Sequence, residues 1–293
     1  MNRPTRMIKA ILYFWIFTVI LWSFASCNPR PDIQEQITQT PSIELKTIST
    51  HTPVAFPTHT ETIAAPPAAT RLPIPQICSP LEGYSLAQIP DTITNPFNPP
   101  AVGSDDPHQA VDLSDIIKNS QVAIDGRIVQ AVLSGRVAGV IRDRFPYGNA
   151  LLVETPLDEM PASWLAHLDL PASVAQTAPH SVLTCPQTEE NNSWLQDEKR
   201  SLYLLYAHLQ MEPGLQPDER VECGQAIGAV GMSGNALNPH LHLEVRVGPA
   251  GASFSSMAHY DSSATTLEMG NYCLWRVSNL FQPVDPLKLF SLP

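Results

Sequence analysis

Basic residues are scarce in this sequence. Lysine and arginine together number 17, against 28 aspartate and glutamate residues, for a formal net charge of −11 at pH 7. A negative charge of this size opposes contact with phosphates, so we expect no nucleic acid partner. Long apolar runs are also rare, and no stretch after Trp22 is long enough to span a bilayer. A protein with several membrane spans is therefore excluded.

Common metal and phosphate motifs are missing too. The cysteines lack the spacing of a zinc finger, and the helical zinc protease motif H-E-x-x-H is absent. The glycine-rich stretch "GAVGMSGN" lacks the lysine of a phosphate-binding loop, which favours ordinary turns. Any metal site must therefore be built from residues that lie apart in the sequence.

The N-terminus has the features of an export signal. Arg3, Arg6 and Lys9 precede the uncharged run "AILYFWIFTVILW", and the small residues of "FASC" follow. This last segment resembles the lipobox of bacterial lipoproteins, which are cut before a cysteine that then carries lipid. We predict a signal peptide over residues 1–27 with Cys27 as the lipidated residue, and the alternative is an uncleaved membrane anchor. Both place the rest of the chain in the cell envelope, outside the cytoplasm and tethered to a membrane.

Residues 28–76 have the composition of a linker. They are rich in proline and threonine and contain no glycine and no clear apolar period. This pattern predicts a stiff, disordered tether. In a polyproline conformation it could reach on the order of 150 Å, enough to carry a domain into a cell wall.

Residues 77–293 have the character of a folded domain. Short apolar runs such as "VAIDGRIVQAVLSGRVAGVI" alternate with turn glycines, which predicts a mostly β, antiparallel fold. A helix is expected around "MPASWLAHLDL", residues 160–170. The segment near 155–200 fits no strand period and looks like a long inserted loop, and a second insertion is expected near 251–271. These insertions could form walls or a lid over a groove, or be plain surface loops.

Four cysteines remain if Cys27 carries lipid, and an even number in an oxidising compartment indicates disulfides. Four cysteines allow three pairings. We favour Cys78 with Cys273, near the two ends of the domain, and Cys185 with Cys223. The alternative is four unpaired thiols.

The stretch "NPHLHLEV" places two histidines one residue apart. In a strand, His240, His242 and Glu244 lie on one face, and the apolar residues between them lie on the other. One face therefore resembles core, and the other is suited to chemistry. Such histidines could equally be structural, so their assignment depends on partners elsewhere in the chain.

Two other segments supply possible partners. In "HQAVD", His108 and Asp112 are four residues apart and can share one face. In "LYLLYAHL", His208 lies on a predicted strand with Leu204 and Tyr206 on its own face. A hydrolytic zinc site uses three nitrogen or oxygen ligands and leaves a fourth position for water, so these segments are sufficient to build one.

Taken together and in this order, "HQAVD", "LYLLYAHL", "ECGQAIGAVGMSGN" and "PHLHLEV" resemble the lysostaphin-type (LytM-like) zinc metallopeptidases. This family cleaves peptide cross-links in bacterial peptidoglycan. The resemblance covers Gly103 to about Val247 and implies a β-sheet sandwich or groove built from a duplicated hybrid motif. It also implies one Zn²⁺ per chain and a zinc-bound water as nucleophile. The residues that it assigns are the zinc ligands His108, Asp112 and His242 and the catalytic pair His208 and His240.

Two other functions are compatible with parts of the pattern. A non-catalytic relative could bind or activate another cell-wall hydrolase, although such regulators generally lack the metal ligands that this sequence retains. A phosphocarrier could also place two histidines together, but export would separate it from its phosphate donor. The sequence therefore favours an exported zinc endopeptidase acting on the stem or cross-bridge peptides of peptidoglycan.

Overall fold

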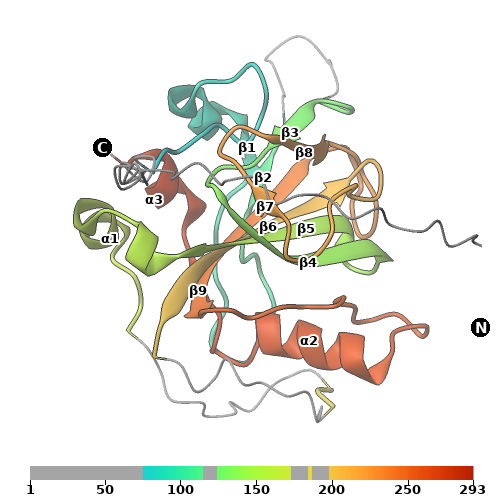
Figure 1. The fold of residues 1–293 in the computed structure, drawn as a ribbon. Coiled ribbons are helices and arrows are strands. Elements are labelled where there is room, and N and C mark those ends of the chain that lie inside the picture. The colour runs from blue at the N-terminus through green and yellow to red at the C-terminus, as the bar shows by residue number, and fades with distance from the viewer. Residues whose placement is uncertain (1–74, 115–123, 173–183, 187–197, 293) are drawn as a thin grey trace, which may run out of the picture. The chain divides into compact units, whose positions relative to one another are not determined.

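The computed structural model describes residues 75–114, 124–172, 184–186 and 198–292 (Figure 1). The predicted signal peptide, including Cys27, and nearly all of the linker predicted over 28–76 lie outside these ranges. Among the described residues, no helix combines the length and the apolar character needed to cross a membrane.

Short helices and strands alternate along the described chain. The helices are η1 (Leu86–Thr92), η2 (Leu157–Glu159), α1 (Ala162–Leu168), α2 (Thr266–Arg276) and α3 (Pro286–Phe290), where η marks a 3-10 helix. The strands are β1 (Ile93–Asn95), β2 (Val111–Leu113), β3 (Ile128–Gln130), β4 (Gly135–Arg144), β5 (Gly148–Pro156), β6 (Arg200–Leu209), β7 (Arg220–Val221), β8 (Ala226–Ala229), β9 (Leu241–Pro249) and β10 (Gln282–Val284).

One antiparallel sheet organises the domain (Figure 1). Its strand order is β1-β2-β9-β6-β5-β4-β7, with β10 also paired to β9, while β3 and β8 form a separate pair. The predicted mostly β, antiparallel fold is confirmed. Because β9 lies between β2 and β6, it brings together three segments that are distant in the sequence.

Strand β9 has the alternation that the sequence predicts. Leu241, Leu243, Val245 and Val247 are fully buried in the larger hydrophobic cluster. Burying each of these side chains contributes roughly 1.5–3 kcal/mol, which fixes the register because a one-residue slip would move all of them out of this cluster to the opposite face of the sheet. The polar residues between them are thereby held on the opposite face of the sheet.

That opposite face carries a second hydrophobic cluster, to which α2 contributes. Trp275 of α2 is fully buried there, with its ring centroid 5.5 Å from that of Phe281. The helix begins with a capping box, in which the Thr265 hydroxyl accepts from the Glu268 N–H (3.2 Å) and the Glu268 carboxylate accepts from the Thr265 N–H (2.9 Å). The capping box fixes the residue at which α2 begins. In its last turn, Trp275 lies against Tyr203 of β6, with 6.3 Å between the ring centroids.

The two segments expected as insertions differ in character. The β5–β6 connection contains η2 and α1, and α1 confirms the helix expected over 160–170. Its residues 173–183 and 187–197 lie outside the described ranges. In the segment 251–271, Ala252 and Met257 are fully buried in the second cluster. This part of the segment belongs to the interior of the domain.

The disulfides do not follow the favoured pairing, which was wrong. Cys78 is bonded to Cys223, with 5.5 Å between their Cα atoms, and Cys185 is bonded to Cys273, with 5.8 Å. The Cys78 N–H donates to the Val132 carbonyl, and the Cys223 sulfur lies 3.3 Å from the same oxygen. Closeness of sequence position to the domain ends thus gave no guide to closeness in space.

Candidate metal centre and catalytic histidines

The structure brings all five predicted site residues together on the sheet. Asp112 of β2 lies directly opposite His242 of β9, and His240 immediately precedes β9. His208 lies near the end of β6, with its ring centroid 4.8 Å from that of His240. His108 precedes β2, and its ring centroid is 5.2 Å from that of His242.

His208 reaches the site through a break in the alternation of β6. The sequence predicts it on the face of Leu204 and Tyr206, and this was wrong, because His242 lies opposite Ala207 on the other face. His208 has a φ of +61°, and the pairing of β5 with β6 shifts register at this point. The extra residue turns the imidazole towards His242, at the cost of a left-handed conformation that histidine adopts only occasionally.

A tight loop supports this unusual histidine. The Ser233 carbonyl accepts from His208 Nδ1 (2.8 Å), and the Ser233 hydroxyl donates to the Leu209 carbonyl (2.8 Å). The loop can approach because Gly148 and Gly234 both have positive φ and their backbones nearly touch, so that a Cβ on Gly234 would lie 2.3 Å from the Gly148 nitrogen. The "GAVGMSGN" stretch therefore acts through turn geometry, as predicted.

The predicted ligand atoms are close enough to share one metal ion. Asp112 Oδ1 lies 2.8 Å from His242 Nδ1 and 3.2 Å from His108 Nε2. Ligands at about 2.1 Å from a tetrahedral zinc lie about 3.4 Å from one another, so a small movement would admit the ion. Asn95 donates to the other carboxylate oxygen of Asp112 (3.0 Å), which leaves Oδ1 directed at the histidines.

The ring nitrogens of His108 and His242 that face away from Asp112, their outer nitrogens, also indicate a metal site. His108 Nδ1 donates to the Pro96 carbonyl (3.0 Å), and His242 Nε2 lies 3.2 Å from Glu244 Oε1. Each ring therefore has oxygen acceptors at both nitrogens. A neutral imidazole carries one N–H and cannot satisfy both, so each ring needs either a second proton or a cation beside Asp112. The donor set fits a metal ion.

Electrostatics favour positive charge at this point. Although burial opposes the charged form, hydrogen bonds from His108 and His242 hold the pKa of Asp112 far below its usual range. Burial also opposes the charged form of His242, but hydrogen bonds to Asp112 and Glu244 raise its pKa to about 9. Because the metal-free site keeps His242 protonated at neutral pH, a metal ion must displace that proton.

His208 and His240 present their other nitrogens to the same space. Each donates from Nδ1 to a backbone carbonyl, that of Ser233 or that of Asn238, both at 2.8 Å. In the neutral ring, Nε2 is then an unprotonated acceptor. His208, His240 and His242 also form a second group whose nitrogens lie within 4.8 Å of one another. Geometry alone would thus allow either trio to hold a metal.

The charge state of His208 leads to a prediction about stability. Burial and the nearby His242 and His240 charges lower its pKa to about 3, whereas histidine in the unfolded chain has a pKa of about 6.5. The unfolded state therefore binds the proton first, and stability falls as pH decreases from about 6.5, by up to about 1.4 kcal/mol per pH unit.

Urea unfolding of metal-free protein at several pH values would measure this slope. His208→Asn is the suitable comparison, because asparagine tolerates positive φ and does not titrate. We expect a shallower decrease in stability for the variant between about pH 6.5 and pH 5. Equal slopes for the two proteins would contradict a neutral, buried His208.

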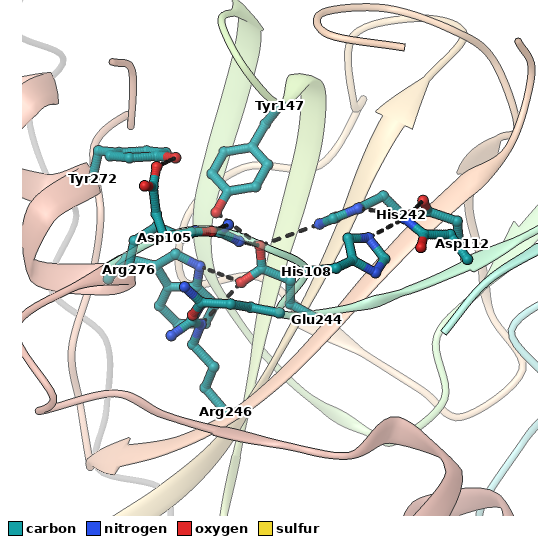
Figure 2. A network of polar contacts seen from close by, with 12 residues as sticks. Asp105, His108, Asp112, Tyr147, His242, Glu244, Arg246, Tyr272 and Arg276 are labelled. Carbon is teal, nitrogen blue, oxygen red and sulfur yellow. Dashed lines mark hydrogen bonds and ion pairs between the residues drawn. The ribbon is translucent and has the colours of Figure 1, made fainter. Parts of the chain in front are cut away.

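Sequence reasoning placed Glu244 on the face of the ligands, where it could hydrogen-bond one of them, but missed the other residues behind the ligands. Glu244 is fully buried and accepts from Tyr147 (2.9 Å), Arg246 (2.9 Å) and Trp275 (2.9 Å), as well as contacting His242 (Figure 2). The alternation of β9 placed Glu244 on the histidine face and was a usable signal. Tyr147 and Trp275 belong to other elements, and no motif connected them to the site.

Comparison with known proteins gives a family match for part of the chain. Residues 184–254 match the model described as Peptidase family M23. This segment contains His208, His240 and His242 and covers the last three of the four motifs. The first motif, with His108 and Asp112, precedes it. A search of curated proteins gives no match.

Several solved structures are similar to this chain at low identity. The catalytic domain of lysostaphin from Staphylococcus simulans is 16% identical, with coverage of 70% of this chain and 97% of that one and a TM-score of 0.35. A mutant catalytic domain of the prophage-encoded M23 protein EnpA from Enterococcus faecalis is 18% identical, with coverages of 56% and 87% and a TM-score of 0.31.

A putative glycyl-glycine endopeptidase lytM from Ruminococcus gnavus is 15% identical, with coverage of 61% of this chain and a TM-score of 0.29. This chain spans less than half of that protein, 44%. The family match and the mostly antiparallel β fold agree with the motifs of the sequence. The similarity to peptidase family M23 therefore lies in residues 184–254, the segment that supplies three of the five candidate residues.

Proposed function

We propose that this domain is a zinc-dependent endopeptidase that hydrolyses peptide cross-links of bacterial peptidoglycan. The observation that carries the proposal is the convergence of a two-histidine, one-aspartate donor set with two further histidines on one face of the sheet. The family match supports a peptidase, and the ordered sequence motifs support peptidoglycan as the substrate.

His108, Asp112 and His242 would hold the zinc ion, a donor set typical of hydrolytic zinc sites with an open position. When bound, zinc polarises the substrate carbonyl and makes a nearby water more acidic. Glu244 and the Pro96 carbonyl hold the outer nitrogens of the two histidines, so that the inner nitrogens face Asp112. The protein thereby fixes the orientation of its ligands before metal arrives.

The two remaining histidines would manage the proton. The neutral form of His240 that donates from Nδ1 to the Asn238 carbonyl leaves Nε2 as an acceptor, and this nitrogen would take the proton from the attacking water and return it to the leaving amine. His208 stays neutral because its pKa is lowered to about 3, so its Nε2 accepts a hydrogen bond and positions that water. Stabilising the oxyanion would require a protonated His208, which this environment disfavours.

We further propose that the protein works outside the cytoplasm, tethered to a membrane through lipid on Cys27. The basic and apolar N-terminal segment supports export. The disulfides Cys78–Cys223 and Cys185–Cys273 support an oxidising compartment. Mass spectrometry of the membrane fraction, with Cys27→Ala as control, tests the anchor.

Metal removal provides the direct test of the enzyme. Purified protein stripped with a chelator should release no soluble fragments from peptidoglycan, and adding about one equivalent of Zn²⁺ should restore release. Fragment masses should increase by one water at a peptide bond. The measurement is mass spectrometry of the supernatant together with metal analysis.

Other outcomes discriminate between the functions. Protein that binds peptidoglycan and zinc but releases nothing from several peptidoglycan types would favour a non-catalytic module of the envelope. Full activity after complete metal removal would contradict the zinc mechanism. Adding Mg²⁺ instead of Zn²⁺ to the stripped protein is the matched control, since Mg²⁺ prefers oxygen ligands and should restore nothing.

A further inference from the structure

Helix α2 contributes directly to the network of polar residues behind the candidate ligands. This network (Figure 2), called the polar layer below, consists of Asp105, Tyr147, Glu244, Arg246, Tyr272 and Arg276. Arg276, its last residue, donates from one terminal nitrogen to Glu244 Oε1 (2.5 Å) and from the other to the Asp105 carbonyl (2.7 Å). The preceding turn donates from the Tyr272 hydroxyl to Asp105 Oδ2 (3.0 Å). Figure 2 shows Arg276 between these two acidic residues, on the side of Glu244 away from Asp112.

The two acceptors of Arg276 lead to the two different histidine ligands. Glu244 Oε1 is the oxygen that faces His242 Nε2, at 3.2 Å. Asp105 lies three residues before His108, in the segment that delivers this histidine to the site. A single guanidinium therefore connects the support of one ligand with the support of the other.

We propose that Arg276 is a positioning residue for both histidine ligands of the metal centre. This inference rests on the proposed function. Its planar fork fixes Glu244 Oε1 towards His242 and holds the backbone at Asp105, so that both imidazoles are aligned before the metal binds. Lysine has one donor group and no fork, and it cannot hold the two acceptors in one geometry.

The two carboxylate oxygens of Glu244 accept from different donors, which makes the role of Arg276 specific. Arg246 and Trp275 donate to Oε2, whereas Arg276 and Tyr147 donate to Oε1. Arg246 also contacts Gln109 and the Phe281 carbonyl, so it anchors the far side of the carboxylate. Loss of Arg276 would leave Glu244 anchored at Oε2 but less constrained at the oxygen that orients His242.

Stability alone accounts poorly for Arg276. The Nε atom of Arg276 is buried and has no hydrogen-bond partner among the residues that the structure describes. An unsatisfied buried donor on a charged group destabilises the folded protein. Proteins with a buried ion pair are often no more stable than variants with apolar residues of similar volume in its place. An arginine at this position is better explained by the two acceptors that it holds.

The test compares Arg276→Lys with Arg144→Lys in the full chain. Arg144 makes a bidentate ion pair to Glu268 at the other end of α2, with bonds of 2.7 and 2.8 Å. Its other side-chain bonds among the described residues go to Ser263, which lies outside the polar layer. Both variants replace by lysine an arginine whose guanidinium makes two or more bonds and which contacts α2 or belongs to it: Arg276 ends α2, and Arg144 ends β4 and bonds to the first turn of α2. We expect Arg276→Lys to bind Zn²⁺ about 10- to 100-fold more weakly in competition with a chromophoric chelator, and Arg144→Lys to bind like wild type.

A second measurement needs no metal. In metal-free protein, the His242 Nε2 proton bonded to Glu244 should give a slowly exchanging imidazole N–H signal in NMR spectra, assigned by its absence from His242→Gln. We expect this signal to broaden or vanish in Arg276→Lys and to persist in Arg144→Lys. Equal signals and equal zinc affinities in the two variants would overturn the proposal while leaving the proposed function intact.

Two other results would also decide the question. If wild type binds no zinc, the proposed function fails, and the NMR comparison alone tests the orientation of His242. If Arg276→Lys does not fold, Arg276→Gln replaces it, because glutamine keeps a neutral donor of similar length. Failure of both variants to fold would make Arg276 a residue required for folding and would overturn its positioning role.

Discussion

Replacing His242 by alanine is expected to abolish metal binding and, with it, hydrolysis. His242 is the residue shared by both possible metal trios, and its Nδ1 is the nitrogen nearest to Asp112, at 2.8 Å. Removing it leaves two donors on one side of the site, so zinc affinity should fall by more than about 100-fold, beyond the usual effect of losing a supporting residue. Metal analysis after dialysis and chelator competition would measure the loss.

His167→Ala is the matched control for this experiment. His167 is exposed on α1 and bonds to Ser291, away from the site. The control should keep about one zinc per chain and full activity. Stoichiometric zinc in His242→Ala would show that the ligand assignment is wrong.

Replacing His240 by alanine should separate metal binding from chemistry. His240 Nε2 lies 3.6 Å from Asp112 Oδ1, farther than the nitrogens of His242 and His108, so the three proposed ligands stay in place. Loss of a general base typically costs about 10²- to 10⁴-fold in rate. We therefore expect normal zinc content and a fall of this size in kcat for fragment release.

The outcome of that experiment also distinguishes the two possible metal trios. If zinc is held by His208, His240 and His242, then His240→Ala should lose the metal and Asp112→Ala should keep it. The proposed set predicts the reverse for both variants. Measuring zinc content in this pair of proteins decides between the sets without an activity assay.

Much of the fold was predictable because apolar alternation determines the faces of a strand. In β9 the alternation of leucine and valine with polar residues correctly placed Glu244 opposite the core formed by Leu241 and Leu243. The five candidate residues were identified from ordered motifs, and the structure places them together. Their individual roles as ligands or catalytic groups stay predictions.

The remaining features depend on contacts that no local pattern encodes. The position of His208 depends on a register shift with β5, which reverses the alternation that held for the preceding residues of β6. The disulfide partner of Cys273 is decided by where the β5–β6 connection passes α2. Arg276 ends a helix that begins inside the insertion predicted near 251–271, and only the folded chain shows its contact with Glu244.

Because of the Cys185–Cys273 disulfide, we expect the metal affinity of a protein sample to depend on whether it was produced under reducing or oxidising conditions. It ties α2 to a segment 88 residues earlier, and a loop of that size corresponds to roughly 4.5 kcal/mol of stabilisation in the chain-entropy model. The same helix carries Arg276 and Trp275. Material produced in a reducing host would contain free thiols at these positions, so two preparations of identical sequence can differ in metal affinity until both are oxidised. Thiol titration therefore belongs beside zinc analysis in any comparison of batches.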